Sequence, residues 1–139
     1  MRPLLRTGPD EPRGESGAVA IEFMLVIGML VVVFLLMLQY AVRAHAERIA
    51  SAAAEEGLAA AASYGGTATG GQREAEGYLT RLGPGLNDTS VDAHRNGTSA
   101  TVTVSGTVEQ LVPFLPVRVQ VRVEGPVERF IPESAGGSP

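Results

Sequence analysis

The longest apolar stretch of the chain lies near its N-terminus. It runs from Ala18 to Leu38, and Glu22 is its one charged residue. As an α-helix, these 21 residues would span about 31 Å, which is enough for the hydrocarbon core of a bilayer. We therefore predict a single membrane-crossing helix over residues 18–42.

The helical pattern continues past the apolar run. Residues 39–63 are rich in strong helix formers and contain no proline, so we predict an alanine-rich extension of the helix over 43–64, outside the membrane. Eight alanines fall within 50–62. Two interpretations stay open: these small side chains let helices of neighbouring subunits approach closely, or they reflect helix propensity alone.

Glycines and prolines divide the next part of the chain into shorter elements. We predict a glycine-rich linker over 65–71. A short amphipathic helix over 72–82 follows, and its predicted apolar face consists of Ala75, Tyr78, Leu79 and Leu82. The linker lacks the Lys-Ser/Thr pair of a phosphate-binding loop, so the glycines do not indicate a nucleotide site.

In the C-terminal half, apolar and polar residues alternate, which is typical of strands with one buried face. Asn96-Gly97 predicts a two-residue hairpin turn, because both residues tolerate positive φ angles. The register would then pair Ala93 with Ala100, Val91 with Val102 and Asp92 with Thr101.

A third strand is predicted over 117–124, where valines alternate with charged and amide side chains. The fold class is therefore α+β: a long N-terminal helix, a short second helix and a small antiparallel sheet of about three strands, with the helices on its apolar face. We predict that the second helix and the sheet form a small domain over 72–131, outside the membrane.

The connection between the second and third strands is apolar but contains two prolines, Pro113 and Pro116, which exclude a central strand. Two interpretations of Phe114 and Leu115 stay open. They form an exposed contact with the membrane surface or a partner subunit, or they pack against the edge of the sheet.

Composition argues against several other functions. The net charge is −4 and no basic cluster is present, so nothing indicates nucleic-acid binding. The chain has no cysteine, and its two histidines, His45 and His94, lack carboxylate neighbours at metal-ligand spacing. No serine lies in a nucleophile-elbow pattern. We therefore expect no enzymatic activity, no metal, no cofactor and no small-molecule substrate.

Glu22 carries the most specific signal in the sequence. A carboxylate in a membrane helix is costly and usually functional, although a residue at the start of a helix is also stabilised by the helix dipole. Glu22 lies five residues after Gly17, and the intervening segment Ala18-Val19-Ala20-Ile21 is uncharged. An aromatic residue, Phe23, follows.

This glycine-to-glutamate segment resembles the cleavage motif of type IV prepilins of the Tad/Flp branch. The whole organisation resembles the TadE-like family of minor pseudopilins in the tight-adherence pilus system. The resemblance implies a leader over 1–17, cleavage by a prepilin peptidase between Gly17 and Ala18, and Glu22 with Phe23 as residues that set register during assembly. One departure is Gly28, where family members often have proline.

The resemblance also implies partners and a location. The partners would be the membrane, the prepilin peptidase, other pilin or pseudopilin subunits and the pilus assembly machinery. The chain would cross the cell membrane once, with a cytoplasmic N-terminus and an extracytoplasmic C-terminal domain. Three arginines in the leader favour this orientation. Residues 132–139 are predicted to be a disordered tail.

Two other functions remain open. Ala44-His45-Ala46 has the small-x-small form of a signal-peptidase site, which would release a secreted binding domain after Ala46. Without any processing, the chain would be a membrane-anchored scaffold whose strands bind another envelope protein.

Overall fold

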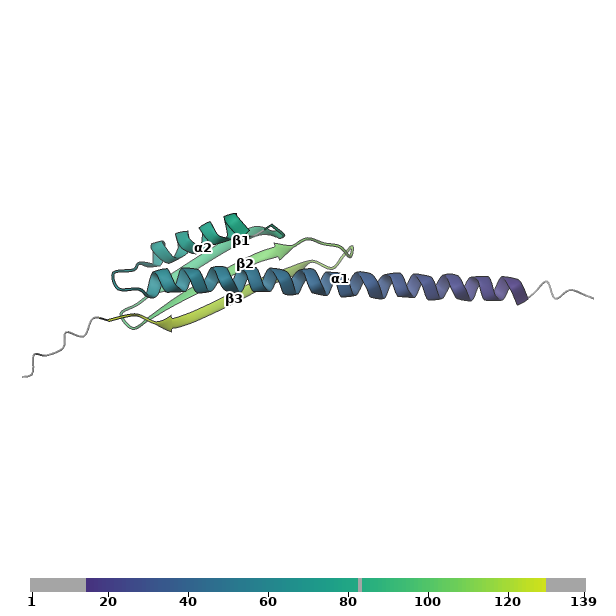
Figure 1. Ribbon diagram of the computed structural model, residues 1–139, viewed down its shortest axis with the longest axis horizontal. Coiled ribbons are helices and arrows are strands. Elements are labelled where there is room, and N and C mark those ends of the chain that lie inside the picture. The colour runs from purple at the N-terminus through teal and green to yellow at the C-terminus, as the bar shows by residue number, and fades with distance from the viewer. Residues whose placement is uncertain (1–14, 83, 130–139) are drawn as a thin grey trace, which may run out of the picture. The chain divides into compact units, whose positions relative to one another are not determined.

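The computed structural model describes residues 15–82 and 84–129. The predicted leader before residue 15 and the predicted tail lie outside them. The elements in chain order are α1 (Glu15–Ala62), α2 (Ala68–Leu82), β1 (Leu86–Arg95), β2 (Ser99–Val108) and β3 (Val117–Pro126) (Figure 1). The α+β class predicted from sequence is confirmed. The chain divides into two compact units, and their boundary lies within α1, between Leu36 and Met37.

The first unit contains the N-terminal part of α1. From Gly17 to Leu36, every side chain except that of Leu35 is exposed. These include large apolar residues such as Phe23, which is 65% exposed, and Met29, which is 70% exposed. Within the described residues, one helix is long and apolar enough to cross a membrane, and it contains this segment.

The second unit contains the rest of α1, α2 and a three-stranded antiparallel sheet of order β1-β2-β3. The C-terminal part of α1 and α2 lie against one face of the sheet (Figure 1). Along β2, buried and partly buried residues alternate without interruption. The core between the layers contains alanines of α1 and valines of the strands, chiefly Ala46, Ala50, Ala53, Ala54, Val102, Val104 and Val119.

The sheet is attached to α1 by polar contacts at two ends. At one end, the Arg95 guanidinium donates to the carbonyl oxygens of Ala61 at 2.7 Å and Ser63 at 3.2 Å, and also to that of Gly66. At the other end, the side chain of Gln39 forms hydrogen bonds with the backbone of the segment that follows β2. From Gln39 to Ala61 the helix advances about 33 Å, and the ten residues of β2 advance about the same distance. The strand therefore matches this length of helix.

The C-terminus of α1 explains why Arg95 is placed there. The last carbonyl groups of a helix have no partner within it, and a cation there also opposes the negative end of the helix dipole. The helix stops at Ala62, two residues before the predicted limit, and Gly65 adopts a positive φ of 73° in the turn that follows.

Helix α2 begins at Ala68, four residues earlier than predicted, so part of the expected linker is helical. The hydroxyl oxygen of Thr67 accepts a hydrogen bond from the backbone N–H of Gly70 at 3.0 Å, which is an N-terminal cap. Two of the four glycines in the predicted linker, Gly70 and Gly71, lie in the first turns of the helix. The close packing of Gly71 against α1 explains why a glycine is suited to its position.

Helices α1 and α2 cross at small residues. A Cβ atom on Gly57 would lie 2.7 Å from the carbonyl oxygen of Gly71, and one on Gly71 would lie 2.7 Å from the Cβ of Ala61. Ala61 and Ala75 are fully buried. Close approach of helices therefore occurs within the chain, and neither interpretation of the alanine-rich segment anticipated this use.

The hairpin register differs from the prediction by two residues. Ala93 lies opposite Val102 and Val91 opposite Val104, so the turn is centred on Gly97-Thr98. The Asn96 side-chain oxygen accepts hydrogen bonds from the backbone N–H groups of Thr98 at 2.9 Å and Ser99 at 2.7 Å, which closes the turn without a positive φ at Asn96.

The error in register did not change the predicted core. Side chains alternate between faces with a period of two, so a shift by two residues leaves every side chain on the same face. Val91 and Val102 are buried together as expected, and Val104 and Val108 are buried with them. On α2, Ala75 and Leu79 are buried and Tyr78 packs against the core, but Leu82 is 53% exposed because it lies at the end of the helix.

Candidate assembly site on the apolar helix

The residues of the cleavage-like motif all lie in α1. Gly17 and Ala18 belong to its first turn, and Glu22 lies seven residues after the first helical residue, Glu15. The N–H groups of a first helical turn lack intrahelical partners, so this end of the helix opens at little cost. The peptide bond between Gly17 and Ala18 therefore lies where local unwinding is easiest.

Glu22 has no partner in the part of the chain that the structure describes. Its side chain is exposed and forms neither a hydrogen bond nor an ion pair there. It also lies about two turns inside α1, and the favourable effect of the helix dipole falls off within the first turn. A role as a helix-start residue therefore accounts poorly for a carboxylate at this position of the uncleaved chain.

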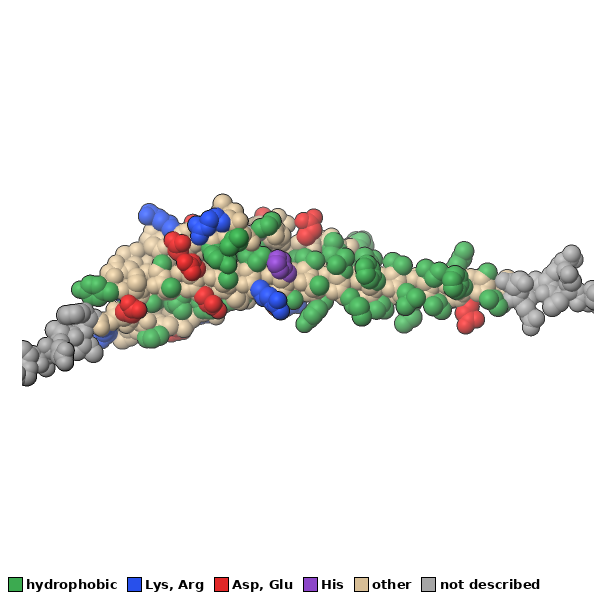
Figure 2. Space-filling view, in the orientation of Figure 1, with side chains coloured by type: hydrophobic (Ala, Val, Ile, Leu, Met, Phe, Trp, Pro, Cys, Tyr) green, Lys and Arg blue, Asp and Glu red, His purple; other side chains and the backbone are tan. Residues whose placement is uncertain are grey.

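Ala18 and Glu22 share one face of the helix because they are four residues apart. The rise between them is about 6 Å. Phe23 is the next residue and is 65% exposed. Hydrophobic side chains cover the N-terminal part of α1 (Figure 2), so Glu22 has an apolar surrounding on its own helix.

Gly28 lies within an uninterrupted stretch of α1. The family that the sequence resembles often has proline at this position. A Cβ atom built on Gly28 would have no neighbour within 4 Å. The glycine is therefore not required by packing within the described chain.

The apolar loop, defined here as residues 111–116, is exposed. Phe114 is 97% exposed and Leu115 is 45% exposed, so the interpretation that packs Phe114 against the edge of the sheet is wrong. Phe114 also has a φ of 69°, an uncommon conformation for a bulky residue. In this conformation the aromatic ring is exposed.

Gln39 holds this loop and was not identified from the sequence. It is only 3% exposed. Its Oε1 atom accepts hydrogen bonds from the backbone N–H groups of Leu111 at 2.8 Å and Val112 at 3.3 Å, and its Nε2 group donates to the carbonyl oxygen of Glu109 at 3.3 Å. A polar residue directly after a long apolar run was the only available signal, and it did not reveal the partner.

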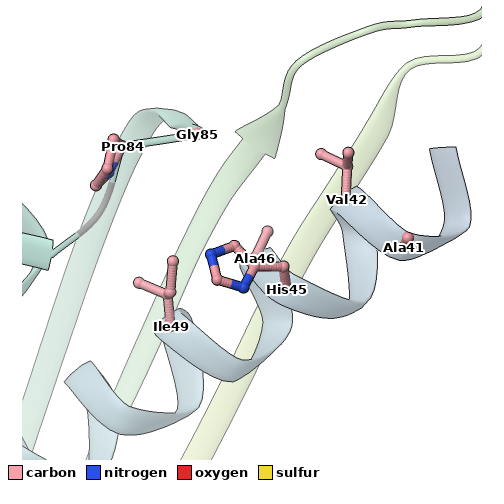
Figure 3. A pocket seen from close by; sticks show the side chains of 7 residues that line it. All are labelled: Ala41, Val42, His45, Ala46, Ile49, Pro84 and Gly85. Atoms are coloured by element: carbon pink, nitrogen blue, oxygen red, sulfur yellow. The ribbon is translucent and has the colours of Figure 1, made fainter. Parts of the chain in front are cut away.

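A shallow hollow of about 290 Å³ lies between α1 and the connection from α2 to β1 (Figure 3). It is lined by Ala41, Val42, His45, Ala46, Ile49, Pro84 and Gly85. His45 is its one titratable side chain and is exposed. Within residues 15–82 and 84–129, no group of three metal-ligating side chains occurs. The lining offers no arrangement for acid–base or metal chemistry.

Comparisons of the chain with protein-family models, curated proteins and solved structures find no match. The features of the chain that bear on its function are the motif at the head of α1, the exposure of its apolar segment and the packing of the second unit.

Proposed function

We propose that this chain is a single-pass membrane pseudopilin. It is a minor, initiating or assembly component of a Tad-type pilus or a related secretion apparatus. It acts by helix packing and has no catalytic role. A prepilin peptidase cuts between Gly17 and Ala18, and Glu22 sets the register of the subunit in the assembly.

The observation that carries the proposal is the carboxylate of Glu22, which has no partner among the described residues and lies in an exposed, otherwise uncharged apolar segment. A charge within a bilayer is costly and is usually retained for a function that supplies a partner. Its spacing of five residues from Gly17 matches the cleavage motif, which identifies a suitable partner: the amine that cleavage would create at Ala18.

The proposed mechanism pairs groups of neighbouring subunits. Cleavage leaves a positive amine on Ala18 at the level of the lipid, and an unpaired charge in a low-dielectric medium costs several kcal/mol. The amine and Glu22 of one subunit are separated by about one helical turn. A neighbouring helix offset along its axis therefore places its Glu22 beside the amine, and this pairing fixes the offset.

The packing of the second unit argues against release by signal peptidase. Cleavage after Ala46 would remove Gln39 and its three hydrogen bonds, and would separate the buried Ala46 from the sheet that it packs against. The released domain would lack part of its own core. An unprocessed membrane anchor retains all of these contacts, so the N-terminus of the native protein distinguishes it from the pseudopilin.

The first experiment is mass spectrometry of the N-terminus of the protein from native membranes. We expect a start at Ala18, with a methylated amine as a further sign of prepilin processing. A start at Glu47 would instead identify a secreted domain, and an intact Met1 would identify an unprocessed anchor.

A second experiment tests the role of Glu22. In Glu22→Ala and Glu22→Gln, we expect membrane insertion to be retained while incorporation into the assembly falls at least about tenfold, because the Ala18 amine loses its partner. Val26→Ala is the matched control, since Val26 lies one turn further on the same face and is 50% exposed. Normal incorporation of both Glu22 variants would refute the proposed register mechanism.

A further inference from the structure

We infer that the apolar loop is a second membrane contact, in which Phe114 enters the interfacial layer of the bilayer on the side where α1 leaves it. The inference goes beyond the proposed function. It depends on α1 crossing a membrane and does not depend on a pilus.

The position of the loop follows from Gln39. The apolar run ends at Leu38. The adjacent Gln39 forms hydrogen bonds with the first two residues of the apolar loop and with Glu109, which lies two residues before the loop. One residue of helix advances about 1.5 Å. A bilayer that surrounds the run up to Leu38 therefore has its surface at the level of Gln39, where the loop is held.

The direction of the loop follows from the sheet. The Arg95 contact places the start of β2 near the C-terminus of α1, and Gln39 bonds the segment that follows its end. Strand β2 thus runs opposite to the part of α1 that follows Met37, and the apolar loop lies at the end of the sheet where Gln39 is bound. A loop at the other end of the sheet, such as the turn at Gly97, would be remote from the bilayer.

The composition of the apolar loop suits the interfacial layer of a bilayer. Residues 110–117 carry no charge, and the exposed side chains of the loop are Leu111, Pro113, Phe114, Leu115 and Pro116. Tyr40, beside Gln39, is 74% exposed. Aromatic side chains at the boundary of a membrane segment are characteristic of the bilayer interface.

Contacts within the apolar loop restrain the backbone conformation of Phe114. A positive φ in a non-glycine residue is unfavourable and persists where surrounding contacts impose it. Here the contacts are the Gln39 hydrogen bonds on one side and the bond from the Leu115 N–H to the Val112 carbonyl oxygen, at 3.4 Å. Prolines at 113 and 116 restrict the chain further. These contacts hold the backbone at Phe114 in the conformation in which its ring is exposed.

The lipid contact depends on apolar insertion more than on charge. Arg118 and Glu109 flank the loop with opposite charges, and Arg43 forms an ion pair with Glu47 at 2.9 Å. Nothing in this set gives a net attraction to anionic headgroups. We therefore expect the contact to form equally with zwitterionic and anionic vesicles.

Tryptophan fluorescence tests the inference, because the chain has no native tryptophan. The full-length Phe114→Trp variant is reconstituted in phosphatidylcholine vesicles, with and without lipids brominated high in the acyl chains. Tyr64→Trp is the matched control, since Tyr64 is 75% exposed and lies beyond the far end of α1. We expect a blue-shifted emission and quenching by brominated lipid for the Phe114 probe, and neither change for the Tyr64 probe.

The other outcomes overturn the inference. A Phe114 probe that is quenched by aqueous iodide as strongly as the Tyr64 probe, and not by brominated lipid, faces water. A blue-shifted Phe114 probe without lipid quenching is covered by protein, such as a second copy of the chain. Quenching of both probes by lipid means that the whole second unit lies on the bilayer.

Gln39→Ala in the Phe114→Trp background tests the positioning role of Gln39. We expect weaker quenching by brominated lipid, because the loop loses the bonds that hold it at the surface. Gln110→Ala is the control: Gln110 is an exposed neighbour of the same loop, and we expect no change. Since the vesicles contain no other pilus protein, failure of the lipid contact would leave the pilus assembly proposal unaffected.

Discussion

The two parts of α1 differ in which apolar side chains they expose and which they bury. Before Leu36, the helix has large side chains that are exposed, such as Phe23 and Met29. After Met37, it buries small ones, such as Ala50 and Ala53, against the sheet. A folded protein in water normally buries its large apolar side chains first. The comparison indicates that water is the solvent for the second region, whereas lipid suits the first.

The second region stays well packed with small side chains because its layers lie close together. Alanine and glycine in α1 permit close approach to α2, and valines of the strands fill the space on the other side. The first region has no such neighbour in the described chain, so it depends on its environment for stabilisation.

The largest effect is expected from a substitution that disrupts the first region alone. Leu30→Arg places a charge near the middle of the apolar run and should raise the free energy of membrane insertion by about 3–4 kcal/mol. We expect the variant to move from the carbonate-resistant membrane fraction to the extractable one. Retention at the wild-type level would show that this segment does not cross a bilayer.

The next largest effect is expected from a substitution that destabilises the second region alone. In Gly57→Ala, the new Cβ atom would lie 2.7 Å from the Gly71 carbonyl oxygen and 2.9 Å from the Ala75 Cβ atom. Overpacking of this kind should lower the free energy of unfolding by about 2–3 kcal/mol. Thermal unfolding in detergent, followed by circular dichroism, measures the loss.

Gly77→Ala is the control for that prediction, because a Cβ atom on Gly77 would meet only the Arg81 Nη1 atom at 3.5 Å. The substitution should stabilise α2 by up to about 1 kcal/mol, since alanine favours a helix over glycine. If both glycine variants unfold at the same temperature, the helices do not cross at Gly57.

A matched pair of valines sharpens the comparison. Val102 is fully buried, so Val102→Ala should lower the free energy of unfolding by about 2 kcal/mol through lost methyl groups and the cavity left behind. Val32 is 56% exposed, and Val32→Ala should change that free energy by less than about 0.5 kcal/mol. Equal effects in the same unfolding assay would mean that the two regions share one core.

The smallest expected effect concerns the turn that sets the register. Asn96→Ala removes the side-chain oxygen that accepts from Thr98 and Ser99, which should cost about 1 kcal/mol. Amide hydrogen exchange should then show faster exchange at the hairpin end of β1 and β2, with no change in the N-terminal part of α1. Unchanged protection would indicate that strand pairing alone fixes the register.

Much of the fold was available from periodicity. The apolar run, the helix that continues past it and the alternation of the strands predicted an α+β chain with one covered face, and the buried valines are those expected. These features follow from local rules: the period of each element decides which side chains share a face. Even the wrong register left that outcome intact, because the error was an even number of residues.

The sequence alone also brought Gly17, Ala18, Glu22 and Phe23 together as one candidate site, because the motif is contiguous and its residues lie within about two turns of a helix. Tertiary structure decided what the spacing of residues could not. The start of α2 depends on a threonine cap and on two helices meeting at Gly57 and Gly71. The loop at Phe114 depends on Gln39, which lies about seventy residues away in sequence. Contacts between distant segments leave no periodic trace along the chain, so only the folded molecule reveals them.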